Sequence, residues 1–159
     1  MMGTDLRLRP AVLPDDVSHA LPWYRDPEVL YGSEGVDVAP YDFDGILGMY
    51  KYLTGIGELY IVEVAGPDGW LPVGDVTLAP HTLPIVIGDA AYRSKGLGKR
   101  VIALLVERAR SLGWERLAVK SIYTYNLRSR RLFEGAGFRI TRTWVDERGQ
   151  EAWSMELPL

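Results

Sequence analysis

Alternating apolar and polar residues mark several short segments of this 159-residue chain as β-strands. A strand that buries one face has this two-residue period, and turn-forming residues bound it on either side. Gly66-Pro-Asp-Gly69 is such a turn, and it separates two apolar stretches that are expected to pair as a hairpin. Strands are predicted over residues 6–9, 59–65, 71–78, 83–88, 117–122, 138–145 and 151–157.

Apolar residues recur with helical spacing in two longer segments. Over residues 101–112, Val101 and Leu105 belong to one apolar stripe, which predicts a long amphipathic helix. Residues 42–56 have the same pattern and are predicted to be a second helix. A further helix is expected to begin at Pro14, because proline is favoured in the first turn of a helix and two aspartates follow it.

A turn rich in glycine and basic residues precedes the long helix. Gly96 and Gly98 lie where this helix begins, and glycine there lets a ligand approach the backbone closely. The first amides of a helix have no partner within the helix, and the helix dipole makes this end attractive to anions. Four cations surround the same point: Arg93, Lys95, Lys99 and Arg100. The turn is therefore predicted to bind a polyphosphate.

Two common nucleotide-binding motifs do not fit this turn. A P-loop requires Ser or Thr where Arg100 stands, and a dinucleotide fingerprint requires a third glycine where Val101 stands. The pattern that remains, Arg-x-x-Gly-x-Gly over residues 93–98, resembles the pyrophosphate-binding signature of the GNAT N-acetyltransferase superfamily. Residues 126–138, Asn-Leu-Arg-Ser-Arg-Arg-Leu-Phe-Glu-Gly-Ala-Gly-Phe, resemble the second GNAT signature and follow the first at the expected distance.

This resemblance implies an α/β (α+β) architecture known as the GNAT fold. It is a mixed, mostly antiparallel sheet of six to seven strands with helices on both faces, and its fourth and fifth strands splay apart. The implied co-substrate is acetyl-CoA, whose pantetheine arm would bind exposed backbone groups of the fourth strand. The residues expected to bind acetyl-CoA are Ile85, Val86, Ile87, Arg93, Ser94, Lys95, Gly96, Leu97, Gly98, Lys99, Asn126, Ser129 and Phe133.

Charge is divided unevenly along the chain, although the formal net charge is only −3. Residues 1–92 carry four basic and fourteen acidic residues, whereas residues 93–142 carry thirteen basic and three acidic residues. The basic block coincides with the predicted CoA half of the site. The acidic block is expected to supply the acceptor side, which favours a cationic acceptor such as a polyamine, an aminoglycoside or a peptide or protein amine.

Four residues of the acidic block are expected to bind the acceptor: Trp23, Tyr24, Glu34 and Asp75. Residues 23–29, Trp-Tyr-Arg-Asp-Pro-Glu-Val, resemble an acceptor-side element of the GNAT branch that contains ribosomal-protein and aminoglycoside acetyltransferases. The two aromatic residues are equally consistent with a purely structural role. A carboxylate within a predicted strand, as at Asp75, is uncommon unless it is paired or functional. An ion pair or a solvent-facing position is the alternative for it.

Acetyl transfer requires a group that accepts the amine proton, because only the neutral amine attacks a thioester. Asp75 is the predicted base and Glu34 the alternative. The tyrosine that serves as general acid in the family is replaced by Phe133 in this chain. Tyr125 is the predicted substitute and Tyr123 the alternative, unless the thiolate leaves with help from water alone. By analogy with the family, a backbone amide of the fourth strand would stabilise the oxyanion.

The composition of the chain limits which catalytic mechanisms, metal sites and cellular locations are expected. The chain has no cysteine, which excludes a disulfide, a thiolate metal site and an acyl-cysteine intermediate, so the amine is expected to attack acetyl-CoA directly in a ternary complex. Two histidines make a dedicated metal site improbable. No apolar run of eighteen residues and no secretory signal are present, so we expect no membrane partner and a cytoplasmic location. Residues 1–159 are expected to form one domain, as a monomer or a homodimer.

Two other classes of function compete with amine acetylation. A non-catalytic acyl-CoA-binding or sensor module is conceivable, because Phe133 has no proton to donate. Nucleic-acid binding would use the arginines of the basic block, but this cluster lacks a readout motif and has an explanation in the phosphates of CoA. We therefore expect no nucleic-acid partner. The arginines concerned are Arg128, Arg130, Arg131, Arg139 and Arg142.

Overall fold

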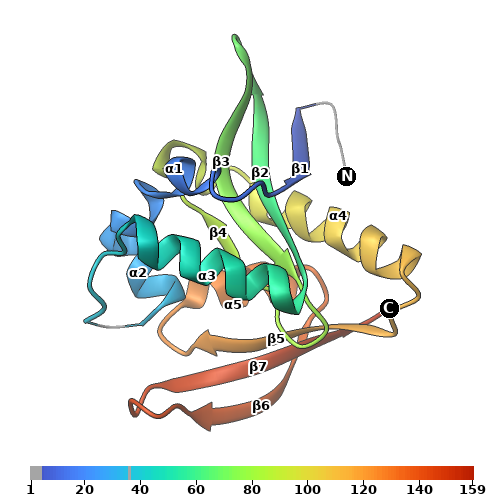
Figure 1. Cartoon of the computed structure of the whole chain (residues 1–159). Coiled ribbons are helices and arrows are strands. Elements are labelled where there is room, and N and C mark those ends of the chain that lie inside the picture. The colour runs from blue at the N-terminus through green and yellow to red at the C-terminus, as the bar shows by residue number, and fades with distance from the viewer. Residues whose placement is uncertain (1–4, 36) are drawn as a thin grey trace.

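The computed structural model describes residues 5–35 and 37–159, and in this part of the chain seven strands form two antiparallel sheets (Figure 1). The first sheet has the order β1-β2-β3-β4, with β1 at Leu6–Pro10, β2 at Glu58–Gly66, β3 at Gly69–Leu78 and β4 at Ile85–Ile87. The second has the order β5-β7-β6, with β5 at Arg116–Tyr123, β6 at Arg139–Val145 and β7 at Glu151–Pro158.

The helices lie between and around these sheets. They are α1 (Val17–Ala20), the 3-10 helix η1 (Trp23–Arg25), α2 (Pro27–Ser33), α3 (Phe43–Ile56), the 3-10 helix η2 (Ala90–Tyr92), α4 (Leu97–Ser111) and α5 (Leu127–Gly135). Aspartate side chains cap the N-termini of α2 and α3. Asp26 accepts a hydrogen bond from the amide of Glu28 at 3.0 Å, and Asp42 accepts one from the amide of Gly45 at 2.7 Å. These are the N-cap contacts that fix where α2 and α3 start.

Two apolar cores lie on opposite faces of the first sheet, as the positions of α3 and α4 in Figure 1 show. Val62 of β2 belongs to the core that α4 covers, together with Leu105. Its neighbour Ile61 belongs to the core that α3 covers, together with Tyr50. Adjacent residues of a strand point to opposite faces, so β2 takes part in both cores. Among the described residues, no helix has the length and apolar character needed to cross a bilayer.

The predicted fold class is confirmed, with three local differences. The helix expected from Pro14 is shorter and begins at Val17, because Asp16 accepts a hydrogen bond from the amide of Val12 at 2.7 Å and holds a turn before it. The strand expected over residues 83–88 covers only β4, since Pro84 has no amide hydrogen to extend the ladder. The seven strands also form two sheets, because β4 and β5 do not pair.

Candidate functional site

A cleft of about 580 Å³ lies beside β4 and the connection that follows β5. The strands β4 and β5 belong to separate sheets. Strand β4 forms one wall, the start of α4 and its preceding turn form the second, the β5–α5 connection forms the third, and α2 forms the fourth. The residues that line it are Glu28, Val29, Tyr31, Gly32, Ser33, Ile85, Val86, Ile87, Tyr92, Arg93, Ser94, Gly96, Leu97, Gly98, Lys99, Tyr125, Asn126, Leu127, Arg128, Ser129 and Leu132.

The start of α4 presents unpaired amides to this cleft. Gly96 has a φ of +79°, in the left-handed region that favours glycine, and α4 begins at the next residue. No side chain of the described residues caps this helix, so the amides of its first turn are available to an anion. At Gly98 a β-carbon would lie 2.9 Å from Cδ2 of Leu132 in α5. The missing side chain therefore lets α4 and α5 approach closely beside the cleft.

Arg93 lines the cleft, but its guanidinium is bonded to the protein. Its Nε donates to the carbonyl of Ile87 at 2.9 Å and its Nη2 donates to the carbonyl of Gly88 at 2.9 Å. Nη2 also donates to the carboxylate of Asp26 at 2.9 Å, and Nη1 donates to that of Glu28 at 3.0 Å. These contacts tie the end of β4 to the first turn of α2.

The other end of α2 is held by the β5–α5 connection. The Tyr125 hydroxyl donates to the carbonyl of Tyr31 at 2.7 Å, and the Asn126 amide donates to the carbonyl of Gly32 at 3.3 Å. These side chains satisfy carbonyls at the end of α2 that have no partner within the helix. The same Asn126 accepts a hydrogen bond from the amide of Ser129 at 3.2 Å and so begins α5. Helix α2 therefore lies across the cleft with both ends fixed.

Tyr125 lines the cleft, and the pKa of its hydroxyl is raised. Its ring lies 4.3 Å from that of Tyr31 and 5.3 Å from that of Tyr123, centroid to centroid. Burial, followed by the neighbouring tyrosines, raises the pKa of Tyr125 to about 12. The hydroxyl is therefore protonated at neutral pH, and it can act as a hydrogen-bond donor but not as a base.

Asp75 is a buried carboxylate rather than a cleft residue. It is 1% exposed, and its Oδ2 accepts hydrogen bonds from the hydroxyls of Tyr24 at 2.8 Å and Tyr50 at 2.7 Å. Burial raises the pKa of Asp75 to about 6, although these two hydrogen bonds act in the opposite direction. Its cross-strand partner Val86 lines the cleft, whereas Asp75 itself does not.

The other predicted acceptor residues, Trp23, Tyr24 and Glu34, also lie outside the lining of the cleft. The ring of Tyr24 lies 5.7 Å from that of Tyr41. Glu34, at the end of α2, has its pKa raised by burial, while a hydrogen bond from Tyr41 lowers it. Trp23 is buried in the same core. The cleft is lined by none of the four predicted acceptor residues, Trp23, Tyr24, Glu34 and Asp75. The expected direct contact between Asp75 and an acceptor amine is not supported by this position.

Eleven of the thirteen residues expected to bind acetyl-CoA line the cleft. The two exceptions are Lys95 and Phe133. The Phe133 ring is buried in the α4 core, 5.2 Å from the Phe138 ring in an edge-on arrangement, so its location differs from that expected of a CoA contact. The cleft also contains residues that the sequence analysis did not select, chiefly on α2. The resemblance over residues 23–29 was the signal that could have identified Glu28 and Val29.

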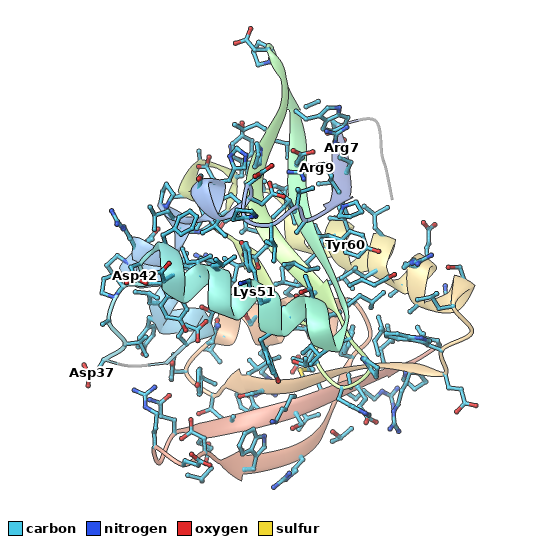
Figure 2. The ribbon with its side chains drawn as sticks, in the orientation of Figure 1. Arg7, Arg9, Asp37, Asp42, Lys51 and Tyr60 are labelled. Carbon is cyan, nitrogen blue, oxygen red and sulfur yellow. The ribbon has the colours of Figure 1, made fainter. Side chains whose placement is uncertain are left out.

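The acidic block does not form an acidic wall. Six of its fourteen carboxylates are neutralised in ion pairs: Asp5, Asp16, Asp26, Glu28, Glu58 and Glu63. Arg7 and Arg9 of β1, labelled in Figure 2, pair with Glu63 at 2.6 and 3.3 Å. Asp37 lies at the outer edge of the molecule in the same view. Glu28 is the acidic residue among those that line the cleft.

Comparison with known proteins agrees with this geometry. Residues 72–138 match the model of the acetyltransferase (GNAT) family. The fold is similar to that of aminoglycoside acetyltransferase AAC(6')-Ib in complex with coenzyme A, with a TM-score of 0.80, 19% identity, and coverage of 96% of this chain and 94% of that one. No curated protein sequence matches the chain.

Two further solved structures have the same fold. Spermidine N-acetyltransferase from Vibrio cholerae, in complex with CoA and spermine, gives a TM-score of 0.78 at 18% identity and covers 98% of this chain and 96% of its own. A GCN5-related N-acetyltransferase from Kribbella flavida gives 0.75 at 19% identity, covering 98% of both chains. The fold of the chain and its segment 72–138 are similar to those of the GNAT acetyltransferases.

Proposed function

We propose that this protein transfers an acetyl group from acetyl-CoA to a primary amine by direct attack in a ternary complex. The observation that carries the proposal is the cleft itself, in which residues of both GNAT signatures meet the start of α4 and the edge of β4. The solved structures with the same fold include acetyltransferases with coenzyme A bound, which supports acetyl-CoA as the co-substrate. The two apolar cores share β2, which supports a single domain.

The cleft contains groups that could bind both the pyrophosphate and the pantetheine arm of acetyl-CoA. The free amides at the start of α4 and the side chain of Lys99 would hold the pyrophosphate, because a helix start and a cation both favour an anion. Arg128, at the other side of the cleft, is the second cation available to the phosphates. Within residues 5–35 and 37–159, no strand pairs with the outer edge of β4 (Ile85–Ile87), so its backbone groups would bind the amides of the pantetheine arm.

The acceptor amine would lie at the α2 side of the same cleft. Glu28 is exposed there, and it retains a carboxylate oxygen beyond the one that bonds Arg93. It would attract a cation, although the paired carboxylates elsewhere add little to this attraction. Known structures of this fold have been solved with spermine and with kanamycin. A polyamine, an aminoglycoside or the amine of a peptide or protein is therefore the proposed acceptor class.

The chemistry assigns different tasks to Tyr125 and Asp75. Nucleophilic attack by the neutral amine forms a tetrahedral oxyanion, and collapse of this intermediate breaks the C–S bond and releases the CoA thiolate. The Tyr125 hydroxyl, which lines the cleft and stays protonated, would turn its single proton from the carbonyl of Tyr31 to the departing sulfur. Asp75 would hold the hydroxyls of Tyr24 and Tyr50 in place by accepting their hydrogen bonds. The amine proton would then leave through water.

Steady-state kinetics test the proposal directly. With acetyl-CoA and a polyamine, an aminoglycoside and a lysine-containing peptide as acceptors, thiol release should depend on the amine and should match the acetylated product. Varying both substrates should give intersecting double-reciprocal lines, as a ternary complex requires; parallel lines would indicate an acyl-enzyme. If CoA binds while no amine accelerates thiol release, the chain is instead a non-catalytic acyl-CoA sensor.

A further inference from the structure

We infer that Arg93 is a positioning residue that holds helix α2 against β4, and that its guanidinium does not bind the pyrophosphate of CoA. The first residue of the glycine signature would then serve the acceptor side of the cleft, while the backbone of the same signature serves CoA. The inference rests on the proposed function, because it assigns a role within the same cleft.

The hydrogen bonds of Arg93 leave little for a phosphate. A guanidinium has five N–H donors, and four of them are directed to Ile87, Gly88, Asp26 and Glu28. Two of these acceptors are carboxylates, so the positive charge is already compensated within hydrogen-bond distance. The side chain is 11% exposed. An incoming pyrophosphate would therefore find one free donor and a local net charge that no longer attracts an anion.

The first turn of α2 depends on this arrangement. Asp26 bonds Arg93 through Oδ2 and caps α2 by accepting the amide of Glu28 through Oδ1. One carboxylate therefore begins the helix and joins it to β4. Helix α2 has seven residues, and a helix of this length has little stability without tertiary contacts. Losing the Arg93 contacts should therefore loosen the N-terminal half of α2, on the side of the cleft where the acceptor is proposed to bind.

The groups proposed to bind the pyrophosphate of CoA do not include the Arg93 side chain. The amides that face the cleft belong to α4, which begins after Gly96, and Lys99 supplies a cation that no ion pair of the described residues engages. The two roles can therefore be separated by comparing variants at positions 93 and 99. Arg93→Gln removes the charge and the contacts to the carboxylates of Asp26 and Glu28, whereas Lys99→Gln removes a cation from the start of α4 and leaves α2 untouched.

The experiment measures CoA affinity by calorimetry and backbone hydrogen exchange of residues 27–33 by mass spectrometry. For Arg93→Gln we expect the Kd for CoA to stay within about threefold of wild type and exchange in α2 to rise by about tenfold or more. For Lys99→Gln we expect the reverse, with CoA affinity lowered by about fivefold and α2 exchange unchanged. Arg93→Lys should restore part of the α2 protection, because an ammonium can still meet one carboxylate.

Two further measurements keep the outcome clear. Glu28→Gln removes one exposed partner and leaves the other Arg93 contacts, so it should raise α2 exchange by a few fold even if Arg93→Gln fails to fold. With an amine that the wild type acetylates, Arg93→Lys should raise the KM for the amine while the KM for acetyl-CoA and kcat change little. A loss of CoA affinity in Arg93→Gln as large as in Lys99→Gln, with α2 exchange unchanged, would overturn the inference. Failure of the wild type to bind CoA would instead remove the proposed function.

Discussion

Asp75→Asn should remove a pH-dependent loss of stability from this protein. The carboxyl has an ordinary pKa of 3.8, and burial raises this pKa to about 6 in the folded state, where Tyr24 and Tyr50 donate to it. The folded state therefore holds this proton more tightly than the unfolded state does. Below pH 3.8 the carboxyl is neutral in both states, and it adds no penalty. As the pH rises through the folded pKa, ionisation costs the folded state about 3 kcal/mol in total, at about 1.4 kcal/mol per pKa unit.

The magnitude can be measured by urea unfolding followed by tryptophan fluorescence between pH 5 and 7.5. Over this interval the stability of wild type relative to Asp75→Asn should fall by roughly 1–2 kcal/mol as the pH rises. Taking the difference removes the contributions of groups that do not interact with Asp75, whereas the negative charge of Glu34 is, besides burial, one of the causes that raise the pKa of Asp75. Asp68→Asn, in the exposed turn between β2 and β3, is the matched control for removing a carboxylate that lies outside the core. A difference between wild type and Asp75→Asn that is constant with pH, or that grows in favour of wild type, would refute the reasoning.

Three further variants test separate parts of the cleft. Gly98→Glu should weaken CoA binding at least about tenfold in calorimetry, because it sets an anion at the first turn of α4 and crowds Leu132; unchanged affinity would mean that the phosphates bind elsewhere. Tyr125→Phe should lower kcat about 10- to 100-fold with a smaller change in the KM for acetyl-CoA, and an unchanged kcat would show that water alone assists the thiolate. Phe133→Tyr should cost about 1–3 kcal/mol in urea unfolding and leave kcat unchanged, since it buries a hydroxyl in an apolar core; a raised kcat would show instead that this position reaches the substrate.

The turn that we propose for CoA binding was predictable because its geometry is encoded locally. Gly96, Gly98 and the helix that follows are within a few residues of one another, and their roles depend on backbone geometry that glycine permits. The second signature was recognisable for the same reason, since Asn126 caps the helix that contains the rest of the motif. Helical and strand periods likewise predicted most elements to within a few residues.

The acceptor side depended on contacts that sequence patterns do not contain. Arg93 lies 67 residues from Asp26, and nothing local to either residue indicates that they pair. Asp75 meets Tyr24 and Tyr50 across three elements, so its burial could not be predicted from the strand around it. The charge blocks alone also do not show which carboxylates are free to attract a cation, because six of the fourteen acidic residues form ion pairs within the fold.

Amine-dependent release of the CoA thiol tests the central claim most directly. Purified protein is incubated with acetyl-CoA and, separately, spermidine, kanamycin and a lysine-containing peptide, and both thiol and acetylated amine are quantified. The account predicts that at least one cationic amine accelerates thiol release, and that acetylated amine forms in equal amount. Binding of CoA without acceleration by any of these amines, or thiol release without an acetylated product, would contradict it.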